Sequence, residues 1–160
     1  MEIIRGIRSA DDERIAAIIR TNLEKFHLDI PGTAYFDPEL SHLSRFYLAE
    51  PAERGYFIAE DAAAGILGGV GFAKFASLEN CAELQKLYLT EAAKGRGLGQ
   101  RLLETAEAGA KKAGFGRLYL ETHSNLTAAI GLYQKLHYEE IPKPDFVFHT
   151  TMDRFFIKDL

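Results

Sequence analysis

Lys94-Gly95-Arg96-Gly97-Leu98-Gly99 is the most informative segment of the chain, because its three alternating glycines join a strand-like apolar run to an amphipathic helix. The apolar run spans residues 84–89, and the helix repeats small and apolar residues at Leu98, Leu102, Ala106 and Ala110. Glycine adopts a positive φ readily and places no Cβ in the path of a ligand, so successive backbone N–H groups can point at one phosphate. The N-terminus of the helix adds free N–H donors and a partial positive charge. The stretch therefore predicts a loop that binds a diphosphate.

The residues around the loop narrow the choice of ligand. A nucleoside-triphosphate loop has the pattern G-x-x-x-x-G-K-[ST], and Gln100 follows Gly99 where that pattern requires Lys, so this class is excluded. A dinucleotide loop has the pattern G-x-G-x-x-G with an acidic residue about 20 residues further on, and Glu121 stands near that distance. This alternative stays open, as does a glycine-rich turn before an ordinary helix.

The loop also resembles the acetyl-coenzyme A loop of the GCN5-related N-acetyltransferases (the GNAT family), which has the pattern Q/R-x-x-G-x-G/A. A second family element, a strand followed by Asn and by a helix that carries a Tyr, is similar to residues 118–136. Two departures are Lys94 in place of Arg or Gln, and His137-Tyr138 in place of Gly-Phe after the helix. Lys94 keeps the charge but lacks the planar fork of Arg, and His137 has to end the helix without the tolerance of Gly for the left-handed region.

The resemblance implies acetyl-coenzyme A as co-substrate. It implies that strand 82–89 splays from its neighbour, so that the N–H of Leu87 polarises the acetyl carbonyl and the N–H of Leu89 binds pantetheine. Asn125 would hydrogen-bond the pantetheine arm, or it would simply cap the helix that follows. The diphosphate would be bound by Lys94, Gly95, Arg96, Gly97, Leu98, Gly99 and Gln100.

Acetyl transfer to an amine requires a base, because an alkylamine has a pKa of about 10.4 and is protonated at neutral pH. In the histone-modifying members of the family a Glu lies four residues before the strand position that contacts the thioester, and Glu83 has this offset from Leu87. A Glu in a partly apolar cleft has a raised pKa and suits a general base that acts directly or through water. Glu83 as a solvated strand residue stays open, and Glu60, Glu79 and Asp153 are weaker candidates for the base.

Tyr133 matches the general acid of the family, whose hydroxyl faces the sulfur of the coenzyme. Because a tyrosine has a pKa of about 10 and a thiol of about 8.5, full proton transfer is uphill by about 2 kcal/mol unless the site changes these values. Tyr133 is also in register with Leu136 and Ala129, which is the pattern of a core aromatic residue.

The order of elements predicts a mixed sheet flanked by helices, and the resemblance implies a mostly antiparallel sheet with about four helices. Helices are expected after a capping box of Ser9 and Asp12, after Asp37-Pro38, from the glycine loop to about Ala113, and over 126–136. Strands are expected over 3–7, 56–60, 66–75, 82–89, 118–122, 146–149 and 154–157.

Length and composition favour one domain over 1–160, because 160 residues with 47% hydrophobic side chains can bury a sizeable core. The net charge of −4 disfavours nucleic acid or an anionic membrane as partner. The single cysteine, Cys81, is expected to be buried and unreactive, and with the absence of a signal peptide it predicts a cytoplasmic protein. The five histidines lack the spacing of metal ligands, so no metal site is predicted.

The leading hypothesis is therefore an N-acetyltransferase in which a bound primary amine, from a small molecule or a peptide, attacks acetyl-coenzyme A directly. The alternatives are a non-catalytic module that senses acyl-coenzyme A and, disfavoured by helix order and length, a nucleotide-cofactor oxidoreductase. Asp29, Asp37 and Glu39 are candidates to attract a cationic amine, although acidic loop residues are more often solvated. The sequence leaves the amine and the formation of a homodimer open.

Overall fold

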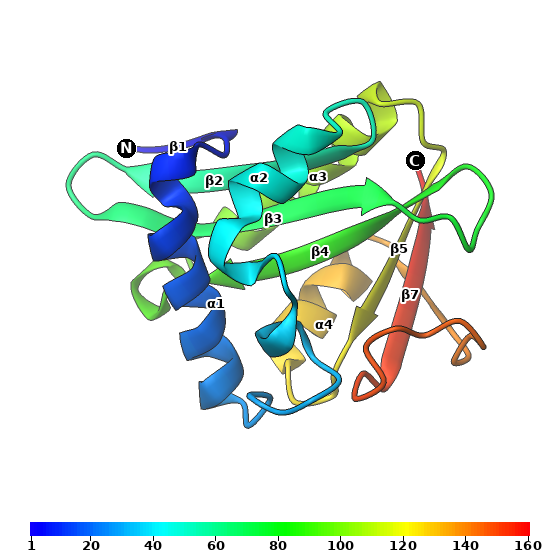
Figure 1. The fold of residues 1–160 in the computed structure, drawn as a ribbon. Coiled ribbons are helices and arrows are strands. Elements are labelled where there is room, and N and C mark those ends of the chain that lie inside the picture. Colours follow the sequence, from blue (N-terminus) through cyan, green and yellow to red (C-terminus); the bar gives the residue numbers. More distant parts are fainter.

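One sheet of seven strands, in the order β1-β2-β3-β4-β5-β7-β6, forms the centre of the computed structural model, which describes residues 1–160 (Figure 1). Neighbouring strands are antiparallel except β4 and β5, which are parallel. The expected mixed, mostly antiparallel sheet is thus confirmed. The strands are β1 (Glu2–Gly6), β2 (Arg54–Asp61), β3 (Gly65–Lys74), β4 (Cys81–Leu89), β5 (Arg117–Thr122), β6 (Glu139–Ile141) and β7 (Arg154–Asp159).

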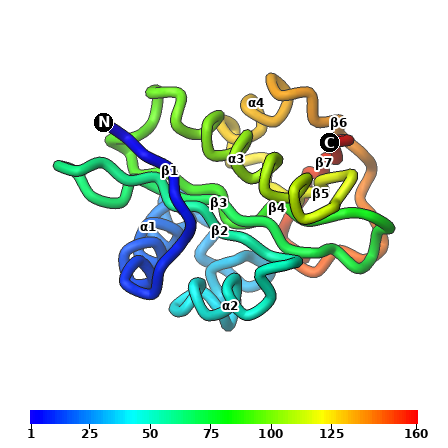
Figure 2. Tube along the Cα trace, turned by 90° about the horizontal axis from the view of Figure 1, so that it is seen from above, coloured from blue at the N-terminus to red at the C-terminus, as the bar shows by residue number.

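Helices cover both faces of the sheet. Helices α1 and α2 lie on one face and α3 and α4 on the other (Figure 2). Each layer has its own apolar core, and Leu98, Leu102 and Ala106 bring the apolar side of α3 onto the sheet. None of the helices is both long and apolar enough to cross a membrane. The helices are α1 (Asp12–Lys25), α2 (Leu43–Ala49), α3 (Leu98–Lys112) and α4 (Thr127–Lys135).

Strands β4 and β5 separate along their length. They pair only from Cys81↔Arg117 to Glu83↔Tyr119, and beyond this point β5 runs away from β4 (Figure 1). On its other side β4 carries an irregularity opposite Gly69 and Gly71 of β3, where Lys86 has a φ of +52°. The predicted splay of β4 is confirmed, and it leaves the edge of β4 after Glu83 without a neighbouring strand.

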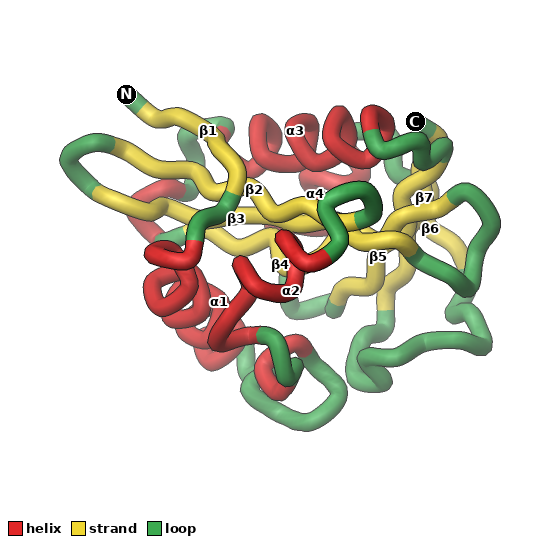
Figure 3. Tube along the Cα trace, turned by 45° about the horizontal axis from the view of Figure 1, so that its top comes forward, coloured by secondary structure: helices red, strands yellow, loops and turns green.

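Two predicted elements are wrong. No helix begins at Asp37-Pro38, because 3-10 turns span Ala34–Phe36 and Leu40–His42, and α2 begins only at Leu43. The carboxylate of Asp37 binds Lys86 of β4, so it is not free to cap a helix. Residues 146–149 are not a strand but part of the loop between β6 and β7, and β7 lies between β5 and the short strand β6 (Figure 3). A short, exposed edge strand shows no apolar alternation, which explains why β6 was not predicted.

The start of α1 also differs from the predicted capping box. Ser9 lies in a 3-10 turn, and the carboxylate of Asp11 accepts a 2.8 Å hydrogen bond from the N–H of Arg8. Asp12 instead accepts hydrogen bonds from the N–H and the hydroxyl of Ser44, at 2.8 and 2.7 Å. Asp12 therefore joins the start of α1 to α2.

Candidate functional site

A cleft of about 340 Å³ opens where β4 and β5 separate. Its walls come from β4 after Glu83, the glycine loop, α4 and the side chains of Asn22 and Phe26. Three predicted site residues, Glu83, Arg96 and Asn125, do not line it. The predicted residues that line it are Leu87, Leu89, Lys94, Gly95, Gly97, Leu98, Gly99, Gln100 and Tyr133.

The glycine loop needs two of its three glycines for backbone reasons. Gly95 and Gly97 have φ values of +76° and +73°, in the left-handed region that other residues rarely adopt. A Cβ on either would meet nothing within 4 Å, so the space beside them is open to a ligand. Gly97 is the N-cap of α3 and supplies no capping side chain. The N–H groups of the first turn of α3 therefore remain available to an anion.

Acidic residues partly neutralise the basic side chains around the loop. Lys94 Nζ lies 2.7 Å from a carboxylate oxygen of Glu91 and 5.4 Å from the ring centroid of Phe26. Arg96 pairs with Glu2, which draws its side chain away from the cleft. Both basic side chains of the loop are therefore already paired with acidic residues.

Asn125 lies beside the cleft rather than in its wall. Its side-chain N–H donates a 3.0 Å hydrogen bond to the carbonyl of Phe26, which ties the start of α4 to the end of α1. The N-cap of α4 is Leu126, with no side-chain cap, so the alternative role of Asn125 as a helix cap is wrong. Its contact with pantetheine stays a prediction.

Tyr133 of α4 lies in the wall of the cleft and is otherwise buried against Tyr138 and Phe156, with ring centroids 5.7 and 5.9 Å away. Burial raises the pKa of Tyr133 above its ordinary value, so the hydroxyl stays protonated at neutral pH. As expected, His137 ends the helix in the left-handed region, with a φ of +68°. The arrangement keeps a hydroxyl donor at the cleft.

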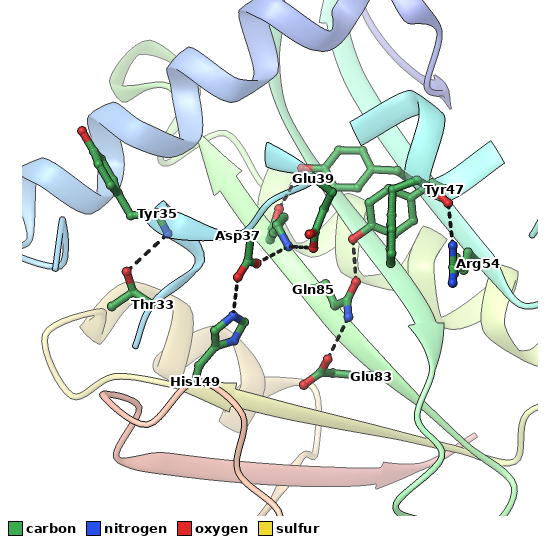
Figure 4. Close-up of polar contacts among 12 residues, drawn as sticks. Thr33, Tyr35, Asp37, Glu39, Tyr47, Arg54, Glu83, Gln85 and His149 are labelled. Carbon is green, nitrogen blue, oxygen red and sulfur yellow. Dashed lines mark hydrogen bonds and ion pairs between the residues drawn. The ribbon is translucent and has the colours of Figure 1, made fainter. Parts of the chain in front are cut away.

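Glu83 belongs to a chain of hydrogen bonds across β4 (Figure 4). The hydroxyl of Tyr47 donates to Gln85 Oε1 at 2.6 Å, and Gln85 Nε2 donates to Glu83 Oε1 at 2.8 Å. The pKa of Glu83 is raised to about 7, chiefly by burial; the hydrogen bond from Gln85 opposes the shift, and the charge of Glu121 adds to it. Gln85 lines the cleft and Glu83 stands next to it, so a group that titrates near neutral pH lies just behind the wall.

A buried ion network joins three segments beside the cleft. Lys86 Nζ lies 2.7 Å from Asp37 Oδ2 and 3.3 Å from Glu39 Oε1, and His149 Nε2 lies 2.8 Å from Asp37 Oδ1 (Figure 4). Burial opposes ionisation of Asp37, but His149 and Lys86 outweigh it and hold its pKa below the ordinary value. Asp37 is thus a buried ion-pair partner and not a solvated loop residue. The network fixes the loop before α2 and the loop before β7 onto the irregular part of β4.

Sequence reasoning missed several residues of the site. Asn22 lines the cleft and donates a 2.8 Å hydrogen bond to the carbonyl of Leu89 at the end of β4. A signal for it exists, because it is a polar residue within the apolar stripe of α1. Lys86 and His149 offer no such signal, since their partner Asp37 is far away in the sequence.

Comparisons with known proteins agree with this geometry. The model of the acetyltransferase (GNAT) family matches residues 16–138. The uncharacterized N-acetyltransferase YjgM of Escherichia coli (strain K12) is 34% identical over 141 residues, which are 87% of this chain and 83% of the relative. An acetyltransferase of the GNAT family from Staphylococcus aureus Mu50 superposes with a TM-score of 0.86 at 20% identity, covering 100% of this chain and 99% of the other. PaiA N-acetyltransferase from Thermoplasma acidophilum, in complex with coenzyme A, gives a TM-score of 0.76 at 18% identity, covering 100% and 99%. The chain therefore belongs to the GNAT family of N-acetyltransferases.

Proposed function

We propose that the protein transfers the acetyl group of acetyl-coenzyme A to a primary amine by direct attack of the amine. The observation that carries this proposal is the meeting of an anion-binding loop and the Tyr133 hydroxyl in one cleft, with Glu83 just behind its wall. The acceptor is an amine of a small molecule or a peptide.

The diphosphate of the coenzyme would bind to the backbone of Gly95, Gly97 and the first turn of α3, with Lys94 and Gln100 beside it. The complex of PaiA with coenzyme A supports this assignment, because the two folds superpose over the whole chain. Leu87 and Leu89 line the cleft on the edge of β4 that has no strand partner. Their N–H groups are proposed to bind the acetyl carbonyl and the pantetheine arm, and Asn125 the same arm. Arg96 can contribute only after it leaves Glu2.

Glu83 is proposed to take the proton of the incoming ammonium group. Because Gln85 stands between Glu83 and the cleft, transfer through a water molecule fits better than direct contact. The freed lone pair forms the C–N bond at the thioester carbonyl, the C–S bond breaks to release a thiolate, and the nitrogen gives up its second proton to solvent or to the departing sulfur. A base with a pKa of about 7 is largely ionised at physiological pH yet still basic enough to act.

Tyr133 is proposed to stabilise the departing thiolate. Since burial raises the pKa of its hydroxyl, full proton transfer to sulfur is costlier than for an ordinary tyrosine. The hydroxyl would therefore act mainly as a hydrogen-bond donor to the developing negative charge, a role that preorganised donors perform well.

The direct test is a screen of primary amines that follows the release of free thiol from acetyl-coenzyme A. The proposal expects thiol release that depends on both the protein and one class of amine. Tight binding of acetyl-coenzyme A without turnover of any amine would instead favour a sensor of acyl-coenzyme A.

A further inference from the structure

Glu121 of β5 presents an unpartnered carboxylate oxygen in the cleft region. It lies two positions beyond Tyr119, which forms the last pair between β5 and β4 with Glu83. Its Oε2 accepts a 2.8 Å hydrogen bond from the hydroxyl of Tyr119. Its Oε1 is shielded from solvent and accepts no hydrogen bond of good geometry, although Glu121 lines the cleft and the backbone of His149 lies close enough to lower the pKa of its carboxyl group. A buried carboxylate oxygen without a donor is unfavourable, which points to a donor that arrives with a ligand.

The charges around Glu121 indicate the sign of that ligand. Four carboxyl groups lie close together here, those of Asp37, Glu39, Glu83 and Glu121. The two basic side chains near them, Lys86 and His149, are both bound to Asp37. Glu83 and Glu121 form no ion pair of their own, although the charge of His149 lowers the pKa of both and that of Lys86 lowers the pKa of Glu83. Burial raises the pKa of Glu121, and the charge of Glu121 helps to raise the pKa of Glu83. Two neighbouring carboxyl groups ionise together readily only when a cation lies near both.

We propose that Glu121 binds the ammonium group of the acceptor, and that the acceptor is an amine with no carboxylate on the carbon that carries the nitrogen. This inference rests on the proposed function. One N–H of the ammonium would donate to Oε1 of Glu121 while a second N–H points towards Glu83, which takes that proton. A carboxylate on the same carbon would lie against two carboxylates and be repelled, so free α-amino acids are poor acceptors.

The pair n-butylamine and norvaline tests this inference, because the two differ by one carboxylate on the carbon that carries the nitrogen. Each is titrated at pH 7.5 into ¹⁵N-labelled protein saturated with coenzyme A, and chemical shifts of β4 and β5 are followed. We expect n-butylamine to bind at least tenfold more tightly than norvaline. Glu121→Gln should weaken the binding of n-butylamine at least tenfold and reduce the difference in affinity between n-butylamine and norvaline, because it keeps the shape of the side chain and removes its charge.

Two further variants make the result specific. Glu140→Gln removes a carboxylate that pairs with Arg154 on the surface, and it should leave both affinities unchanged. Glu121→Asp keeps the charge and serves if Glu121→Gln does not fold, which a melting measurement with coenzyme A reveals. It should keep the preference for n-butylamine. Equal binding of norvaline, no effect of Glu121→Gln on n-butylamine, or no binding of n-butylamine would each overturn the inference.

These outcomes are separate from those of the proposed function, because the titration needs no turnover. If n-butylamine binding depends on Glu121 but no amine causes thiol release from acetyl-coenzyme A, only the proposed function is wrong. If the protein turns over an amine but Glu121→Gln leaves the affinity for n-butylamine unchanged, only this inference is wrong.

Discussion

Gln85 Nε2 donates a 2.8 Å hydrogen bond to Glu83 Oε1, and the hydroxyl of Tyr47 fixes the Gln85 amide in this orientation from its other end. A donor to a carboxylate favours the ionised form and lowers its pKa. Gln85→Leu should therefore raise the pKa of Glu83 above its value of about 7 and move the acidic limb of the pH profile of kcat/KM to higher pH. The control Gln134→Leu changes an exposed glutamine of α4 and should leave the limb in place. An unmoved limb in Gln85→Leu would show that Glu83 is not the titrating group.

Glu83→Gln should change the slope of the pH profile as well as the rate. In the unmodified protein kcat/KM should fall as pH drops through about 7, because Glu83 becomes protonated, and should stay level from there to the pKa of the amine, about 10. Glu83→Gln has no base, so only the free amine reacts, and kcat/KM should rise about tenfold per pH unit over the same interval. Its rate at pH 7.5 should be about 10² to 10⁴ times lower. A level profile in the variant would refute the assignment of the base.

Tyr133→Phe should lower kcat by about 10- to 10⁴-fold while the affinity for coenzyme A changes little, because only the hydroxyl donor is lost. Tyr138→Phe is a matched control, since Tyr138 packs against Tyr133 and its buried hydroxyl has no partner. That control should keep full turnover and unfold no more easily than the unmodified protein. If Tyr133→Phe and Tyr138→Phe lose thiol release equally, the effect comes from altered packing of the two rings and not from loss of thiolate stabilisation.

Gly97→Val should weaken coenzyme A binding by more than about tenfold, because a β-branched side chain both strains the left-handed backbone and blocks the loop. Gly65→Val separates these two effects. Gly65 has a φ of +76° and open space around its Cβ position, but it begins β3, outside the walls of the cleft. Calorimetric titration should find normal coenzyme affinity in Gly65→Val despite a similar loss of stability. Equal affinities of the two variants for coenzyme A would show that the glycine loop is not part of the coenzyme site.

The sequence predicted best what depends on local pattern. The glycine loop and the helix that carries Tyr133 follow from residue types at short spacing, whereas the end of that helix at His137 follows from the family resemblance. The network of Lys86, Asp37 and His149 does not follow from any local pattern, because it joins segments that meet only through the tertiary fold.

A second limit is burial, which the sequence conveys poorly for polar residues. The sequence predicts Asp37 as a helix cap and allows it to attract an amine or to be a solvated acid, yet it is buried; for Glu83 it allows either a base or a solvated strand residue. The chain of Tyr47, Gln85 and Glu83 depends on α2 packing against β2 so that the Tyr47 side chain reaches β4, which no pattern within either segment indicates.

Initial rates of thiol release, with acetyl-coenzyme A and an accepted amine varied together, show whether the amine attacks acetyl-coenzyme A directly. Direct attack requires both substrates on the protein at once, so double-reciprocal plots should intersect and no thiol should appear without amine. Parallel lines, with one equivalent of thiol released by the protein alone, would reveal an acetylated protein intermediate and contradict the account.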